Sequence, residues 1–296
     1  MKAFENMKGA LMSTDMKQPG YQLLYWSMFA FLIFVSVGVC LFPVVWILLS
    51  GFKGPQELYS VPATLFPENF NIMKLAEVWC KMKIYAYYLN TTYMALGHTF
   101  FVLVISGLAG YVLSKIKPVG TRLINNIVFW LMLIPGTMST VPLYMTFKEF
   151  PVFGFSMLDT YWPMWLLGAA SPFNIILFKS YFNGIPNEII EASRIDGLSD
   201  VGVFGKIMMP MGQPIFLVVG LFAFMGSFGT FLWPYLIITD ADKTVLAVQL
   251  YKLRSTTYTQ DYQMLAVLYS VLPLILLYAI FQDRIVSGIN LGGVKG

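Results

Sequence analysis

The sequence predicts an all-α integral membrane protein with six transmembrane helices, and three observations support this fold class. Its 296 residues are 57% hydrophobic and 11% charged, whereas a soluble chain carries roughly 25% charged residues. The mean hydropathy is +0.69. The apolar residues gather into six segments of about spanning length, near 22–50, 90–114, 123–147, 158–181, 211–238 and 263–282. Because lipid offers the backbone no hydrogen-bond partners, each span is expected to be helical.

The distribution of basic residues predicts the orientation. Residues 1–21 carry lysines, and the apolar run after them is too long for a cleaved signal peptide, so it is expected to stay as the first span. Lys115, Lys117 and Arg122 crowd the second loop, whereas the third loop holds only Lys148. The positive-inside rule therefore places both termini, the second loop and the fourth loop in the cytoplasm.

The second span contains His98, the only histidine. A proton relay would need several ionisable partners within the spans, so we expect His98 to bond a neighbour or a backbone carbonyl. Ser106 and Gly110 lie four residues apart and predict a face for close helix packing.

Prolines predict breaks in the third and fourth spans, at Pro135, Pro142, Pro163 and Pro172. Broken helices can expose backbone groups to a polar substrate, or they can simply shape the bundle. The sequence is compatible with both interpretations. Asn174 is the notable polar side chain here, because burying an amide without a partner is costly.

The outer half of the fifth span is rich in glycine and aromatic residues, including Phe228, Gly229 and Trp233. Exposed rings beside closely approaching backbone would suit stacking on sugar faces. Aromatic belts at a membrane interface have the same composition, so both interpretations stay open.

Residues 185–210 form a polar stretch between the fourth and fifth spans. Pro186 suits a first helical turn and Gly197 a left-handed helix end. Ser199 can cap a second helix, on which Val201, Phe204 and Met208 repeat at helical spacing before Pro210 ends it. This stretch contains four carboxylates and only two basic residues: Glu188, Glu191, Asp196 and Asp200 against Arg194 and Lys206. Because interfacial lipid-binding helices are usually basic, this acidic surface favours a protein partner.

Several motifs are missing from the sequence. It has no G-x-x-x-x-G-K-[ST] phosphate loop, no G-x-S-x-G elbow and no cluster with metal-ligand spacing. We therefore expect a transport subunit rather than an enzyme, with no catalytic residue, metal or cofactor of its own. There is no basic run for nucleic acid, and the nearly charge-free spans do not favour a proton- or sodium-driven transporter.

The polar stretch carries a family pattern: Glu191-Ala192-Ser193, Gly197, Ile207, Met209 and Pro210 match the spacing of the EAA loop. With Arg194-Ile195-Asp196-Gly197 and Phe231-Leu232-Trp233-Pro234, the chain resembles the MalG-like permease subunits of carbohydrate ATP-binding-cassette importers, from about residue 22 to the end. Ser193 departs from the usual second alanine. Phe228-Gly229 stands where many sugar permeases have Trp-Asn, which puts a substrate contact there in doubt.

The resemblance implies a type I importer permease (MetI-like) fold over residues 22–296, in a bacterial cytoplasmic (inner) membrane. It implies a second, MalF-like permease, an ATPase dimer that binds ATP and Mg²⁺, and an external solute-binding protein. The coupling contacts would be Glu188, Glu191, Ala192, Ser193, Arg194, Asp196, Gly197, Ile207 and Pro210. The expected substrate-path residues, chosen by polarity and depth, are Asn174, Phe228, Gly229 and Trp233. A sugar or oligosaccharide is the expected cargo; another polar solute, or a non-transporting scaffold or sensory subunit, are the alternatives.

Overall fold

The computed structural model describes residues 19–151, 154–253 and 258–292, and these residues form helices and no strand. The predicted all-α class is therefore confirmed for the described part of the chain. The segments 1–18 and 293–296, which include most of the basic N-terminal segment and the Val294-Lys295-Gly296 ending, lie outside it.

Fifteen α-helices follow one another along the described part of the chain. They are α1 Pro19–Phe52, α2 Pro55–Leu58, α3 Met73–Lys81, α4 Ile84–Tyr111, α5 Thr121–Leu131, α6 Thr140–Lys148, α7 Trp162–Leu166, α8 Pro172–Asn183, α9 Asn187–Ile195, α10 Asp200–Val203, α11 Met209–Met211, α12 Gln213–Phe228, α13 Leu232–Ile237, α14 Leu246–Lys252 and α15 Gln260–Gly292. Two π-helices, Val112–Ile116 and Phe204–Met208, extend α4 and α10, and 3₁₀ turns occupy Gly136–Ser139 and Ala241–Lys243.

Three helical stretches among the described residues are long and apolar enough to cross a membrane: Tyr25–Phe52, Ile84–Ile116 and Gln260–Asp283. Two bent pairs pass the same test together, Thr121–Leu131 with Gly136–Lys148 at 92° and Asp200–Met211 with Gln213–Phe228 at 84°. The count is thus three, or up to five if each bent pair is one span. Six spans stay a prediction, because segment 158–181 forms two short helices, α7 and α8.

Proline accounts for the breaks that the sequence predicted. Pro135 lies between α5 and the 3₁₀ turn, and Pro172 opens α8 after the extended residue Ser171. A missing N–H and a fixed φ suit proline to a first helical turn and not to a helix interior. The third and fourth segments are therefore broken helices, as predicted.

Several helix ends differ from the predicted ends of the spans. The helix that contains the second span begins at Ile84, whereas the span was expected to begin near 90. Ile84 is fully buried, and the helix runs from it through Asn90 without a break. The fifth segment is divided between α12 and α13, with Gly229 ending α12. The final helix runs from Gln260 to Gly292, beyond both ends of the expected span 263–282. Hydropathy marks where lipid contact ends, whereas a helix continues through polar residues that favour it.

The chain divides into two compact units, residues 1–72 with 259–268 and residues 73–258 with 269–296. In the first unit, the side chains described on α1 are almost all exposed up to Val45. At the end of α1, Phe52 stacks on Phe70 with ring centroids 4.2 Å apart, and the buried Lys53 ammonium donates to the Thr64 carbonyl. The loop after α1 is therefore packed around Phe52 and Lys53.

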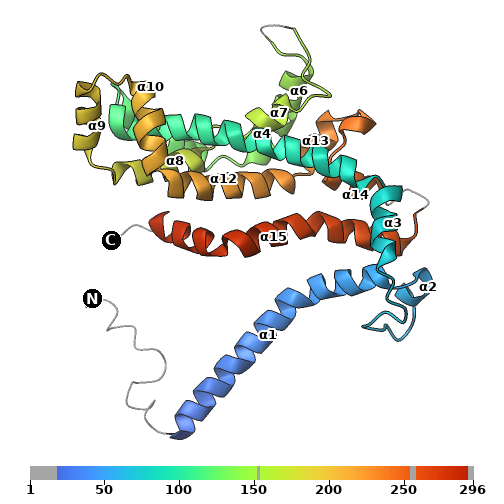
Figure 1. Cartoon of the computed structure of the whole chain (residues 1–296). Helices are drawn as coiled ribbons and strands as arrows, with labels where there is room; N and C mark the ends of the chain where they lie inside the picture. Colours follow the sequence, from blue (N-terminus) through green and yellow to red (C-terminus); the bar gives the residue numbers. More distant parts are fainter. Residues whose placement is uncertain (1–18, 152–153, 254–257, 293–296) are drawn as a thin grey trace. The chain divides into compact units, whose positions relative to one another are not determined.

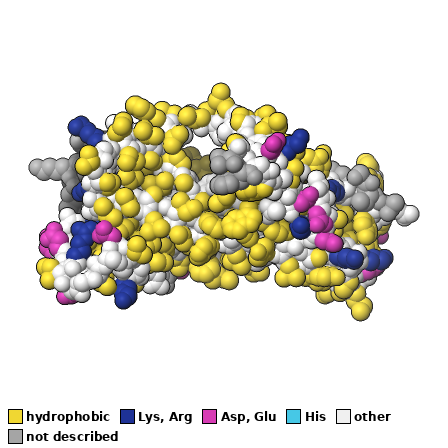
Figure 2. All heavy atoms as spheres, turned by 90° about the horizontal axis from the view of Figure 1, so that it is seen from above, with side chains coloured by type: hydrophobic (Ala, Val, Ile, Leu, Met, Phe, Trp, Pro, Cys, Tyr) yellow, Lys and Arg dark blue, Asp and Glu magenta, His cyan; other side chains and the backbone are white. Residues whose placement is uncertain are grey.

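In the second unit, α4, α8 and α12 lie side by side (Figure 1). The prediction for Ser106 and Gly110 is confirmed. The Ser106 hydroxyl donates to the Ala169 carbonyl at 2.6 Å, and a Cβ on Gly110 would lie 2.5 Å from the Phe178 Cβ. Only glycine allows α4 and α8 to approach this closely. Hydrophobic side chains predominate in the view of Figure 2, as expected for a protein in contact with lipid.

Candidate functional site

The residues predicted to contact an ATPase lie in a short helical segment, residues 185–211, which we call the knob. It contains α9, α10, the second π-helix and α11, and α9 and α10 lie at one end of α4 (Figure 1). Gly197 has φ +87° and follows α9, and the Ser199 hydroxyl accepts a hydrogen bond from the Gly202 N–H at 3.3 Å at the start of α10. The left-handed glycine and the serine cap are both as predicted.

The inner face of the knob belongs to the apolar core. Ile190, Val203, Phe204 and Met208 are buried in one cluster with residues of α4, α8 and α12, among them Tyr111, Phe178, Phe182, Ile215 and Val219. Ile207 is partly buried against the same cluster. The knob is thus packed tightly onto the helices that carry it, and a displacement of the knob must displace them.

The outer face is exposed and mixes carboxylates with apolar groups. Among the predicted coupling residues, Glu188, Glu191, Ala192, Arg194, Asp196, Gly197 and Pro210 are exposed. Ile195 is 86% exposed and Val201 76% exposed beside them. Arg194 and Asp200 form an ion pair at 2.8 Å, which raises the pKa of the arginine. Because these two charges offset each other, Glu188, Glu191 and Asp196 give the surface its negative character.

Two details of the knob differ from the prediction. Val201 was expected on the buried face with Phe204 and Met208, but Val203 takes that place, because the π-helix at Phe204–Met208 changes the helical period. Pro210 does not end the second helix, since it lies in the first turn of α11, which runs to Met211.

Ser193 is buried, unlike its neighbours Ala192 and Arg194. Its hydroxyl donates to the Ile190 carbonyl at 2.8 Å, within α9. The serine that departs from the family pattern is therefore satisfied inside the knob and adds no polar group to the outer face.

Lys115 ties the start of the knob to the end of α4. Its ammonium donates to the Ile185 carbonyl at 2.5 Å and to the Asn187 side-chain oxygen at 2.8 Å. A cation beside the carbonyls at a helix C-terminus is favourable, and here it lies just past the end of α8. The second and fourth loops consequently lie at the same end of this unit.

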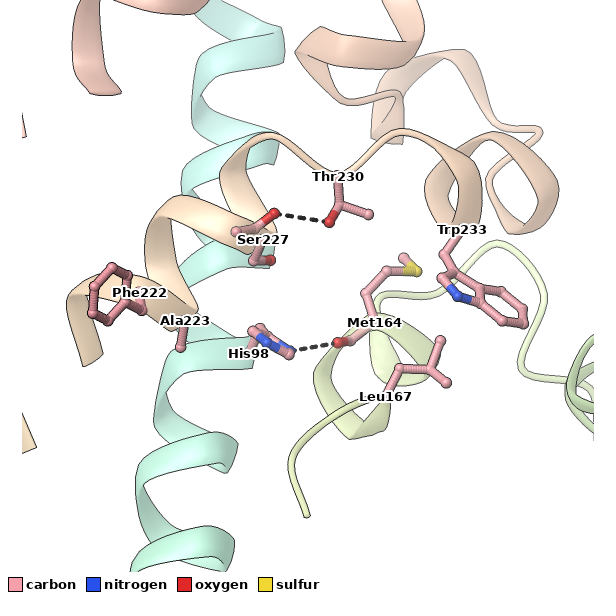
Figure 3. Close-up of a pocket in the computed structure, with 9 residues that line it drawn as sticks. His98, Met164, Leu167, Phe222, Ala223, Ser227, Thr230 and Trp233 are labelled. Atoms are coloured by element: carbon pink, nitrogen blue, oxygen red, sulfur yellow. Dashed lines mark hydrogen bonds between the residues drawn. The ribbon is translucent and has the colours of Figure 1, made fainter. Parts of the chain in front are cut away.

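A pocket of about 180 Å³ lies among α4, α7, α12 and the α12–α13 break (Figure 3). Its lining comes from the fourth and fifth segments as well as from α4: His98, Met164, Leu167, Phe222, Ala223, Gly226, Ser227, Thr230 and Trp233. Leu167 directly follows α7, and Thr230 lies between α12 and α13. The breaks after α7 and after α12 therefore border this cavity, whereas the break at Pro135 does not.

Polar groups converge on this pocket. The His98 Nδ1 lies 2.9 Å from the Met164 carbonyl, the backbone bond that the sequence predicted for this histidine. The Thr230 hydroxyl donates to the Gly226 carbonyl at 2.9 Å, and the buried Ser227 lies beside it (Figure 3). A mostly apolar cavity with a few placed polar groups is typical of a small-molecule site.

Of the four predicted substrate-path residues, the pocket includes only Trp233. Phe228 is buried with its ring against Tyr88 and Phe224, Gly229 ends α12, and Asn174 is half-buried on α8. The other lining residues were not predicted as substrate contacts, because only the fold brings three separate segments together. The single histidine and the glycines around Ser227 were the available signals.

Comparisons with known proteins match this architecture. The family model described as "Binding-protein-dependent transport system inner membrane component" matches residues 91–291. The diacetylchitobiose uptake system permease protein NgcG of Streptomyces coelicolor is 31% identical over 268 residues, which cover 89% of this chain and 86% of NgcG. The arabinooligosaccharides transport system permease protein AraQ of Halalkalibacterium halodurans is 26% identical, with 95% of this chain and all of AraQ covered.

Among solved structures, a bacterial ABC transporter involved in the import of the acidic polysaccharide alginate matches with a TM-score of 0.76 and 21% identity. The match covers 89% of this chain and 97% of that chain, and at this identity it shows a shared fold. Since the family model covers more than half of the sequence, this chain belongs to the inner-membrane components of binding-protein-dependent transport systems.

Proposed function

We propose that the chain is the transmembrane permease subunit of an ATP-driven importer that carries a sugar or oligosaccharide across the bacterial cytoplasmic membrane. The observation that carries the proposal is the two-sided knob. Its inner face is packed into the core of α4, α8 and α12, and its outer face exposes carboxylates together with the apolar residues Ile195 and Val201, as expected of a docking surface. The names of the relatives support a carbohydrate cargo, since they include diacetylchitobiose and arabinooligosaccharide systems.

The topology in this proposal has six spans and cytoplasmic termini. The bonds of Lys115 to Ile185 and Asn187 support it, because they bring together the two loops that the charge distribution assigns to the cytoplasm. The knob then faces the compartment that holds ATP.

The proposed complex has further subunits. A second, MalF-like permease completes the pathway, an ATPase dimer binds ATP and Mg²⁺, and an external solute-binding protein delivers the cargo. This chain itself performs no hydrolysis and holds no cofactor. The knob docks in a cleft of one ATPase subunit through Glu188, Glu191, Asp196 and the exposed apolar residues.

The packing supports a route for the coupling. The core under the knob includes Phe178 and Phe182 of α8 and Ile215 and Val219 of α12. Helix α12 continues to Ala223 and Ser227, which line the pocket. Closure of the ATPases would therefore move one wall of the pocket through a continuous packed helix.

The test compares two glycines of the same backbone conformation. Gly197 has φ +87° and Gly120 has φ +88°, and a Cβ at either position meets no atom within 4 Å. Gly197→Asp and Gly120→Asp therefore carry a similar backbone cost, but only the first places a charge on the outer face of the knob. We expect Gly197→Asp to abolish sugar uptake and binding-protein-stimulated ATPase activity in proteoliposomes, and Gly120→Asp to retain both.

The same preparation tests the whole proposal. A wild-type complex that shows stimulated ATPase activity and no uptake of any sugar would point to another polar solute, and ligand screening of the binding protein would identify it. A complex with neither activity would favour a scaffold or sensory subunit. Wild-type coupling in Gly197→Asp would contradict the assigned role of the knob.

A further inference from the structure

We propose that the pocket at His98, Ser227, Thr230 and Trp233 is a subsite for one uncharged sugar unit, and that it excludes sugar acids. The inference rests on the proposed function, and it adds a substrate class and specific contacts that the importer assignment does not contain. Its basis is the hydrogen-bonding state of each polar group in the lining.

His98 offers the pocket a hydrogen-bond acceptor. Its Nδ1 lies 2.9 Å from the Met164 carbonyl, which can only accept, so the proton belongs on Nδ1. In the neutral ring the other nitrogen, Nε2, then carries a lone pair. The bond to Met164 thus sets the tautomer and holds the ring against the wall of the pocket (Figure 3).

Thr230 offers a second acceptor. Its hydroxyl proton is donated to the Gly226 carbonyl at 2.9 Å, which leaves its lone pairs for a ligand. Ser227, one helical turn after Ala223 on α12, supplies a hydroxyl that can donate or accept. Two of the three polar groups are therefore hydrogen-bond acceptors, and the hydroxyl groups of a sugar can donate hydrogen bonds to them.

A carboxylate cannot make the same hydrogen bonds as a sugar hydroxyl. It brings lone pairs and no proton, and it faces two groups whose own protons are already committed. None of the described residues that line the pocket is Lys or Arg, and moving a carboxylate out of water without a counter-charge is costly. The same lining that suits a CH₂OH group therefore disfavours a COO⁻ group at that position.

Size and shape agree with a single unit. The cavity of about 180 Å³ is below the roughly 300–1,000 Å³ of common small-molecule pockets, so it accommodates one ring and not a chain of several. Trp233 presents an aromatic surface, held by an edge-on contact with Phe147 at 5.8 Å between ring centroids. An aromatic face suits the apolar C–H face of a sugar ring.

The experiment measures binding of matched sugar pairs to the full transporter in nanodiscs, without the binding protein, by saturation-transfer NMR. The probes are galactose with galacturonate and glucose with glucuronate, which differ only in CH₂OH against COO⁻. We expect saturation transfer to at least one neutral sugar, and at least about tenfold weaker binding of its acid. Equal binding of the two members of a pair would overturn the proposal.

Variants locate the binding. Thr230→Val removes the acceptor and should weaken neutral-sugar binding about tenfold. Thr99→Val is the matched control, because the Thr99 hydroxyl also donates to the carbonyl four residues earlier, at 2.8 Å, but does not line the pocket. Trp233→Ala should abolish binding, whereas Trp130→Ala, at a tryptophan that is 62% exposed on α5, should not. Loss of binding in both threonine variants would overturn the assignment.

Sugar uptake by the complete transport system distinguishes a failure of the proposed subsite from a failure of the proposed importer function. If wild-type proteoliposomes transport a neutral sugar that shows no saturation transfer, or that still binds fully in Thr230→Val, the subsite is wrong and the importer function stands. If no sugar is transported, the proposed function itself fails.

Discussion

The two ends of the α4–α8–α12 core differ in how they are filled. Where the knob packs on α8 and α12, Met208, Phe178 and Phe182 have no exposed surface, and the aromatic rings of Phe178 and Phe216 lie 4.8 Å apart. Around Ser227 and Trp233 the same unit leaves a cavity of about 180 Å³. One end of the core is solid and the other is hollow.

The difference matches two tasks. Closely packed side chains transmit a displacement because they cannot be compressed, which suits the region that contacts a moving partner. A ligand needs space and a few polar groups, which suits the region bordered by broken helices. Both regions contact α12, so a displacement of the knob also displaces the residues of α12 that line the pocket.

The largest effect on stability is expected from Met208→Ala at the solid end. Met208 is fully buried on the inner face of the knob, so its truncation should lower the free energy of unfolding by about 2–5 kcal/mol. The next residue provides the control, because Met209 is 41% exposed and Met209→Ala should change stability by at most about 0.5 kcal/mol. Thermal unfolding of the purified complex measures both; equal losses would contradict the packing under the knob.

A smaller loss is expected from Gly110→Ala, where α4 meets α8. The added Cβ would lie 2.5 Å from the Phe178 Cβ and 2.9 Å from the Lys179 backbone nitrogen, so the helices must separate, at about 1–3 kcal/mol. Gly38→Ala on α1 is the matched change in a helix interior with no atom within 4 Å. It should stabilise the helix slightly, since alanine favours helix over glycine. Thermal unfolding again reads both variants, and a stable Gly110→Ala would show that the contact is not rigid.

The hollow end should respond in the opposite way to added volume. Ala223→Leu places three more carbons beside His98, in space that the cavity supplies, so we expect a stability change below about 1 kcal/mol. Neutral-sugar binding and uptake should be lost, because the leucine occupies the subsite. If the variant unfolds as easily as Gly110→Ala, the cavity is not open in the native protein.

The sequence was informative where local rules decide the structure. Gly197 and Ser199 were placed correctly because a left-handed helix end and a cap depend on a few adjacent residues. Pro135 and Pro172 marked breaks for the same reason. The pocket was mostly missed, since Thr230, His98 and Met164 are far apart in the chain and only the packing of α4, α7 and α12 brings them together. Val201 was misassigned because a π-helix alters the spacing on which the helical pattern depends.

The smallest effect is expected from Ser193→Ala, which tests the border between the two faces of the knob. The hydroxyl is buried and bonds only within α9. Removing it loses one hydrogen bond of about 1 kcal/mol and gains the better helix propensity of alanine, about 0.5 kcal/mol. The net change in stability should therefore stay near or below about 0.5 kcal/mol, with stimulated ATPase activity unchanged.

The converse change separates burial from residue type. Ala192→Ser adds a hydroxyl one residue earlier, on the exposed face. It should lower the free energy of unfolding by only about 0.5 kcal/mol, the difference in helix propensity, but reduce stimulated ATPase activity severalfold, because the added hydroxyl lies where the ATPase subunit is proposed to dock. A strong coupling defect in Ser193→Ala with normal coupling in Ala192→Ser would contradict the proposal that the ATPase subunit contacts the exposed face of α9.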